Sequence, residues 1–96
     1  MTTAPPANTL LFENERTRVW EMLIEPGDTY PIHAHEYPYL SLIMESASLA
    51  LIGEDGSEEK LEAEAGAVIW GEPPDVHGVR NVGRTRFRNR LVEFKV

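Results

Sequence analysis

Short apolar or alternating runs recur along the whole chain, with turn residues between them, and no stretch keeps a helical period. Runs of this kind are typical of β-strands. Asp55-Gly56 predicts a hairpin turn, and Pro73-Pro74 predict a loop because proline cannot donate to a strand ladder. The pattern therefore predicts an all-β sandwich or barrel of about eight strands, at 9–12, 18–25, 39–45, 48–52, 58–64, 68–70, 76–81 and 85–96.

The three histidines of the chain lie in two short segments. His33 and His35 are two residues apart in a β-like stretch, so their side chains leave the same face. His77 follows 42 positions after His35, with several expected strands between them. A fold that brings the two segments together makes a three-imidazole site, which suits Fe, Zn, Mn, Ni or Cu. The alternative is a barrel without metal, in which each histidine has its own hydrogen-bond partner.

Composition limits the class of protein. A chain of 96 residues supports one domain, and without cysteine it has neither disulfides nor thiolate metal ligands. Its first residues lack a positively charged leader, and no segment approaches the roughly 18 apolar residues of a membrane span. We therefore expect a cytoplasmic protein with no membrane partner. Residues 1–8 are expected to be a flexible arm, and 9–96 a single domain.

Charge is unevenly distributed along the chain. The net charge of −7 argues against a nucleic-acid partner, because phosphate binding needs basic surface. From Arg80 to the end, however, the chain has six basic residues and one acidic residue, Glu93. This segment therefore carries a net charge of +5, and the rest of the chain carries −12. This basic strand either pairs across a sheet with acidic neighbours, pairs across a dimer interface, or attracts an anionic ligand.

The first histidine segment resembles the first motif of the cupin superfamily, whose members are small jelly-roll β-barrels (double-stranded β-helices) with the metal inside. Gly27, His33 and His35 fall on positions of that motif. Tyr39 stands in the place of the usual glutamate, and Ser46 in that of the final glycine.

The second segment resembles the second cupin motif. Gly66, His77 and Asn81 match it, whereas Glu72 and Pro74 stand where a proline and a glycine are usual. From about residue 16 to 95 the chain also resembles small single-domain cupins labelled as β-alanine degradation proteins. The resemblance implies a jelly-roll barrel over 9–96, a metal held by the three histidines, and a homodimer that pairs through strands at one edge of the barrel.

The missing glutamate affects the expected chemistry. Three neutral imidazoles leave the metal close to its full +2 charge and keep positions open, which favours an anionic small molecule. The resemblance implies a dioxygenase-like oxidoreductase or an isomerase, and the alternative is a non-catalytic metal or metabolite-binding module. Tyr39 is either a catalytic hydroxyl donor or a core aromatic. Glu36 follows His35 directly, so it points to the opposite face and is a poor fourth ligand. Glu45 is also a poor candidate, because it lies about six residues past Tyr39 along an extended strand.

The last strand carries a second candidate catalytic residue, Glu93. Its two faces are Phe87, Asn89, Leu91 and Glu93 against Arg88, Arg90, Val92 and Phe94, and neither is cleanly apolar. If the first set faces inward, Asn89 and Glu93 are candidates for metal support or a general base; if the second does, the arginines are candidates for binding a carboxylate. Asn81 is expected to fix a turn. The residues expected to wall the cavity are aromatic: Trp20, Tyr30, Tyr37 and Trp70.

Overall fold

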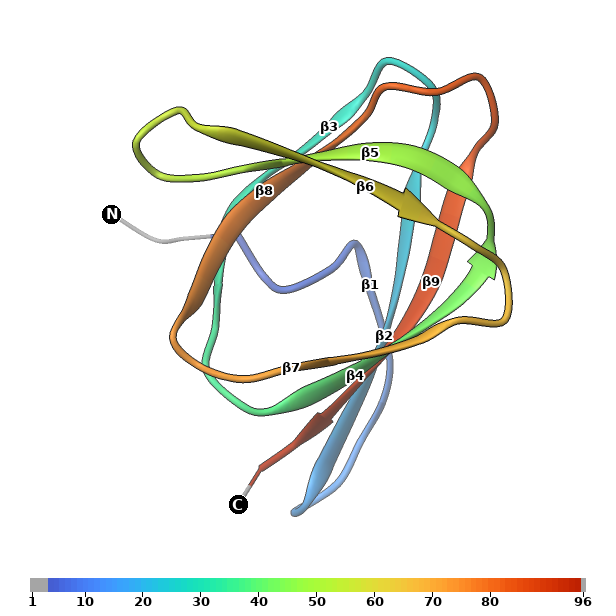
Figure 1. The fold of residues 1–96 in the computed structure, drawn as a ribbon. Helices are drawn as coiled ribbons and strands as arrows, with labels where there is room; N and C mark the ends of the chain where they lie inside the picture. Colours follow the sequence, from blue (N-terminus) through green and yellow to red (C-terminus); the bar gives the residue numbers. More distant parts are fainter. Residues whose placement is uncertain (1–3, 96) are drawn as a thin grey trace.

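The computed structural model describes residues 4–95, and these form nine β-strands and no helix (Figure 1). The all-β prediction is confirmed, and the first histidine segment is itself a strand. This part of the chain contains no helix long and apolar enough to cross a membrane. The strands are β1 (Thr9–Glu13), β2 (Thr17–Ile24), β3 (Thr29–His35), β4 (Tyr39–Glu45), β5 (Ala47–Ile52), β6 (Glu58–Ala63), β7 (Val68–Gly71), β8 (Asp75–Asn81) and β9 (Phe87–Phe94).

The strands form two antiparallel sheets. One has the order β1-β2-β9-β4-β7 and the other β3-β8-β5-β6. Figure 1 shows the two sheets curving around a common interior. Strands adjacent in the sheets are often distant in sequence, so the interior is lined from almost every part of the chain.

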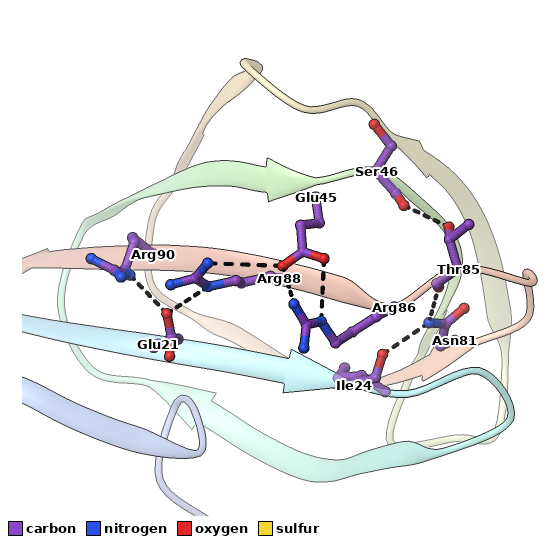
Figure 2. Close-up of polar contacts among 9 residues, drawn as sticks. All are labelled: Glu21, Ile24, Glu45, Ser46, Asn81, Thr85, Arg86, Arg88 and Arg90. Atoms are coloured by element: carbon purple, nitrogen blue, oxygen red, sulfur yellow. Dashed lines mark hydrogen bonds and ion pairs between the residues drawn. The ribbon is translucent and has the colours of Figure 1, made fainter.

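The last strand, β9, lies in the middle of the five-stranded sheet, between β2 and β4. Phe87, Asn89, Leu91 and Glu93 are its buried set, so this set faces the interior. The outward arginines pair with acidic neighbours in the same sheet: Glu21 accepts from Arg88 Nε at 2.7 Å and from Arg90 Nε at 3.0 Å (Figure 2). The basic strand thus pairs across the sheet, and its central position leaves it no free edge for a partner subunit.

Asn81 fixes the chain after β8, as expected. Its Nδ2 donates to the carbonyl oxygens of Ile24, at 2.9 Å, and Thr85, at 2.8 Å (Figure 2). Its Oδ1 accepts from the Gly83 amide at 3.0 Å. The side chain is fully buried. One amide therefore holds together the ends of β2 and β8 and the loop that leads to β9.

The described part of the expected N-terminal arm lies against the barrel. Ala7 is fully buried, and the Tyr30 hydroxyl donates to the carbonyl oxygens of Pro5, at 2.7 Å, and Ala7, at 3.0 Å. Asn8 Oδ1 accepts from the Leu23 amide at 2.6 Å. Residues 4–8 are thus tied to β2 and β3, and residues 1–3 lie outside the described chain.

Glu93 of β9 forms an ion pair with Arg18 of β2. Glu93 is fully buried, and its Oε1 accepts from Arg18 Nε at 2.7 Å and from Trp20 Nε1 at 2.6 Å. The Arg18 guanidinium also lies over the Trp20 ring, 5.3 Å from its centroid. A buried carboxylate is tolerated only with such partners, because its loss of hydration is costly.

Replacing Arg18 with alanine should lower the free energy of unfolding by about 3 kcal/mol, because Glu93 would stay buried without its cation. Urea unfolding at neutral pH measures the effect. Adding Glu93→Gln to the Arg18→Ala protein should recover much of the loss. Arg80→Ala, which breaks the exposed Arg80–Glu58 pair, should cost less than about 1 kcal/mol. A loss for Arg18→Ala as small as that of Arg80→Ala would contradict the assignment.

Candidate metal centre

The pairing of β3 with β8 brings the three histidines together. His33 lies directly opposite His77 in the antiparallel register, and His35 follows two residues later on the same face. Each histidine offers a ring nitrogen, and these nitrogens all lie within 4.8 Å of one another. The Nε2 atoms of His33 and His35 are 3.1 Å apart. The convergence expected from the sequence is therefore present in the structure.

Hydrogen bonds fix the orientation of two of the rings. His33 Nδ1 lies 3.0 Å from the Pro31 carbonyl oxygen and donates to it, which leaves Nε2 with a free lone pair. His77 Nδ1 lies 2.8 Å from Asp75 Oδ1 and donates in the same way. In both rings the anchored nitrogen is Nδ1 and the unprotonated one is Nε2, as metal ligation requires.

Burial favours the neutral form of His33 and His35. It lowers the pKa of His33, and together with the neighbouring histidines it lowers the pKa of His35 to about 3. Two neutral Nε2 atoms at 3.1 Å would present facing lone pairs unless a proton or cation lies between them. That separation is compatible with both nitrogens lying about 2.1 Å from one metal ion. The donor set therefore fits a divalent transition metal.

Tyr39, in the place of the cupin glutamate, acts on this cluster in two ways. Its ring stacks on His35, with centroids 4.2 Å apart. Its hydroxyl donates to Asp75 Oδ2 at 2.5 Å, and Asp75 Oδ1 accepts from His77. Burial and the Asp75 carboxylate hold the pKa of Tyr39 well above its ordinary value. Tyr39 is thus a protonated donor that fixes Asp75, which in turn fixes His77.

Asp75 is the functional residue that the sequence reasoning missed. It was assigned to the proline loop but is the first residue of β8. Burial alone would raise its pKa, yet the hydrogen bond from Tyr39 and the proximity of His77 keep it below the ordinary value. A signal was present, because an aspartate two residues before a strand histidine shares its face.

The candidate carboxylate ligands lie elsewhere. Glu45 pairs with Arg86 at 2.7 Å, and Glu36 is exposed at the turn before β4. Within residues 4–95, the group of potential metal ligands consists of the three histidines. Glu93, the other predicted catalytic residue, is bound to Arg18 and Trp20 and is absent from the described cavity lining. Its position indicates a structural role, so we do not include it in the site.

A cavity of about 260 Å³ adjoins the histidines. Four aromatic residues were expected to wall it. Trp70 borders the cavity, but its ring stacks on Phe94 on the outer face of the sheet, with centroids 5.9 Å apart. Trp20 binds Glu93, Tyr30 contacts the His33 ring edge-on, and Tyr37 lies against Arg18. Apolar side chains make up most of the wall; they are Pro6, Met22, Ile43, Leu49, Leu51, Leu61, Ile69, Val79, Phe87 and Leu91. The polar lining residues beside the histidines are Tyr39, Ser41, Asp75 and Asn89.

No family model and no curated protein matches the sequence. Solved structures do match. A cupin domain from Bordetella pertussis superposes over 100% of this chain and 99% of its own, with a TM-score of 0.85 and 25% identity. An RmlC-like cupin from Desulfovibrio desulfuricans covers 86% of this chain and 77% of its own (TM-score 0.61, 21% identity). An RmlC-like cupin from Methanocaldococcus jannaschii covers 97% of this chain and 86% of its own (TM-score 0.67, 15% identity).

The chain belongs to the cupin superfamily. Its fold is the double-stranded β-helix of that superfamily, as the resemblance implied. These comparisons do not support the narrower label of a β-alanine degradation protein. In this cupin a tyrosine, Tyr39, stands at the position of the usual glutamate, and a glycine on the neighbouring strand leaves room for its ring.

Gly71 is that adaptation. It lies opposite Tyr39 in the β4–β7 register, and a Cβ at this position would collide with the Tyr39 ring. Gly71→Ala should therefore displace the ring and lower the free energy of unfolding by about 1–3 kcal/mol. Urea unfolding in a double-mutant cycle with Tyr39→Ala tests this, because the added methyl should cost little once the ring is gone. Equal costs in both backgrounds would show that the two residues are not coupled.

Proposed function

We propose that this cupin binds a divalent transition metal through His33, His35 and His77, and that an anionic small organic molecule binds at that metal within the adjoining cavity. The observation that carries the proposal is the convergence of three imidazoles in the lining of a largely apolar cavity. The hydrogen bonds that hold two of the rings through Nδ1 support it, since histidine ligands in metalloproteins are generally fixed in this way.

Electrostatics supports an anionic ligand. The ligand set adds no negative charge, so a bound metal would keep nearly its full +2 charge and open positions. Asp75 is the one carboxylate in the described lining, and it is engaged by Tyr39 and His77. A carboxylate or enolate group at the metal end is therefore favoured over a cation, although the whole chain carries −7. Fe, Zn, Mn, Ni and Cu are all compatible with imidazole ligands.

The cavity favours an oxidoreductase over an isomerase. An isomerase that moves a proton needs a free base, and no described lining residue is a lysine, a glutamate or an unengaged carboxylate. A bound metal would supply Lewis acidity and, if it is iron, oxygen activation. The protein's own residues hold the ligand, exclude water through the apolar walls, and keep the Tyr39 hydroxyl proton directed at Asp75. A cytoplasmic location remains part of the proposal.

The same shortage of free acid and base groups also favours the second candidate, a non-catalytic metal or metabolite-binding module. Oxygen uptake and product analysis separate the two. The iron-loaded protein would be incubated with thiols, β-diketones and short carboxylates. Turnover of any of them supports the oxidoreductase, whereas binding without turnover across the panel supports the module.

His77→Ala should remove one ligand and lower both the metal content and the metal-dependent stability. Elemental analysis after reconstitution with Zn²⁺ measures the first, and thermal melting with and without added Zn²⁺ measures the second. The wild-type protein should gain thermal stability with Zn²⁺, and the variant should lose most of that gain. Arg80→Ala, on the same strand but facing an outward ion pair, should behave as wild type. Unchanged metal occupancy in His77→Ala would refute the proposed site.

A further inference from the structure

A polar pair lies inside the cavity, apart from the histidine cluster. Asn89 of β9 and Ser41 of β4 both line the cavity and are only 6% and 8% exposed. Asn89 Nδ2 donates to Ser41 Oγ at 2.8 Å. Asn89 Oδ1 is buried and accepts no hydrogen bond from the described chain. Leaving such an acceptor unpaired costs about 1–3 kcal/mol, so a ligand atom that satisfies it is favoured.

The pair presents one acceptor and one donor to the cavity. Asn89 Oδ1 accepts, and the Ser41 hydroxyl keeps its proton to donate because its oxygen already accepts from Asn89. A ligand hydroxyl satisfies both, since it donates and accepts through one oxygen. A second carboxylate does not, because it would face Oδ1 without a cation, and the described lining holds neither lysine nor arginine. An ammonium group would leave the serine proton without an acceptor.

The Asn89–Ser41 pair lies close to the histidine cluster, where the metal of the proposed function would bind. Tyr39, which stacks on His35, and Ser41 are two residues apart on β4, so they share a face and are separated by roughly 7 Å along the strand. The wall of the cavity is largely apolar. The site therefore has an anion-binding end, an apolar wall and a hydroxyl-binding end.

We propose that the ligand class of this cavity is a short aliphatic carboxylate with a neutral hydroxyl group at its far end. The inference rests on the proposed function, which places the carboxylate at the metal, and it adds the group that Asn89 and Ser41 recognise. Asn89 is then a specificity residue.

Calorimetric titration of the zinc-loaded protein tests this with three probes: hexanoate, 6-hydroxyhexanoate and hexanedioate. The hydroxy acid should bind about 5- to 10-fold more tightly than hexanoate, because two hydrogen bonds form in a buried place. Hexanedioate should bind more weakly than hexanoate. Equal affinity for hexanoate and its hydroxy derivative would overturn the inference.

Variants separate this inference from the proposed function. Asn89→Leu, which is nearly isosteric and removes the unpaired acceptor, should abolish the hydroxyl preference while hexanoate binds at least as well. His77→Ala should instead weaken all three probes together. If the hydroxyl preference is present and His77→Ala leaves affinity unchanged, the proposed function is wrong and the hydroxyl site stands. If hexanoate needs His77 but Asn89→Leu changes nothing, only the hydroxyl site fails. No binding of any probe would overturn both.

A second surface carries an independent inference. Phe12, Val19, Val92, Leu40 and Trp70 are register partners in turn, so they form one apolar row across all strands of the five-stranded sheet. The row lies on the outer face, because β4 and β9 bury the alternate residues. Phe12 and Trp70, at its two ends, are 54% and 53% exposed. Val68, which is 60% exposed, lies beside the row.

The area and charge of this face fit a second copy of the chain. The five strands contain 32 residues, and at about 4.8 Å between strands and 3.3 Å per residue they give an area of roughly 500 Å² per copy. Two copies would bury about 1,000 Å² in total, which is the lower limit for a specific interface. The flanking charges of Glu21, Glu45, Arg86, Arg88 and Arg90 pair with one another (Figure 2), so two such faces can approach without the repulsion expected of two chains of −7.

We infer that the outer face of the five-stranded sheet, centred on this apolar row, is the interface of a homodimer. The two copies pack face to face and not through a sheet edge. Sedimentation velocity over a range of protein concentrations tests it. The wild-type chain should sediment as a dimer, and Phe12→Glu with Trp70→Glu should give a monomer with a native circular dichroism spectrum. Val82→Glu, at an apolar residue 42% exposed after β8, should leave the dimer intact. A wild-type monomer at every concentration, or a dimer unaffected by the double substitution, would overturn the inference.

Discussion

The antiparallel register of β3 and β8 is the constraint on which the site depends, because it alone places His33 opposite His77. A slip of one residue would turn the β8 side chains to the other face and remove His77 from the cluster. Contacts at the far end of the pair hold this register. The Asn81 amide donates to the Asp28 carbonyl at 3.0 Å, the Gly27 amide donates to the Asn81 carbonyl at 2.9 Å, and β5 pairs with the other edge of β8. Gly27, the first residue of the first cupin motif, and Asn81, the last residue of the second, therefore support the pairing that holds the histidines.

Local pattern was sufficient for most of the strands and for placing His33 and His35 on one face, since both follow from a period of two within single segments. The approach of His77 depends on the pairing of β3 with β8, which local pattern does not encode. Local pattern was also insufficient for β9. Asn89 and Glu93 lie on the inner face, where sequence reasoning expects apolar residues, so the two faces looked equally polar. The choice between them depends on Arg18 and Trp20, which are more than 70 positions away and satisfy Glu93. Asp75 was missed for a related reason. Its position two residues before His77 shows only that the two share a face, whereas the Tyr39 hydroxyl that fixes it comes from the other sheet.

The substitution of tyrosine for the usual glutamate has consequences beyond the lost carboxylate. A glutamate would add one negative charge to the ligand set. Tyr39 instead keeps its proton and acts on His77 indirectly, through its hydrogen bond to Asp75. The negative charge is thus moved from the metal position to a residue that orients His77. Because Gly71 accommodates the ring, the exchange involves two strands, β4 and β7, and is not a single-site variation.

Three buried polar groups of the inner face show how differently such groups can be stabilised. Glu93 is paired through its Oε1 with Arg18 and Trp20, whereas its Oε2 accepts no hydrogen bond from the described chain. The Nε2 atoms of His33 and His35 lie 3.1 Å apart, and the metal ion that we propose would stabilise both of them. The Asn89 side-chain nitrogen donates to Ser41, whereas its oxygen has no partner in the described chain. Asn89 lines a cavity whose walls are largely apolar. Asn89 differs from Glu93 in two respects: it lines the cavity, and no cation of the described chain pairs with it. The unpaired Asn89 oxygen is therefore better explained by a ligand than by the needs of folding, because leucine in that place would stabilise the barrel more.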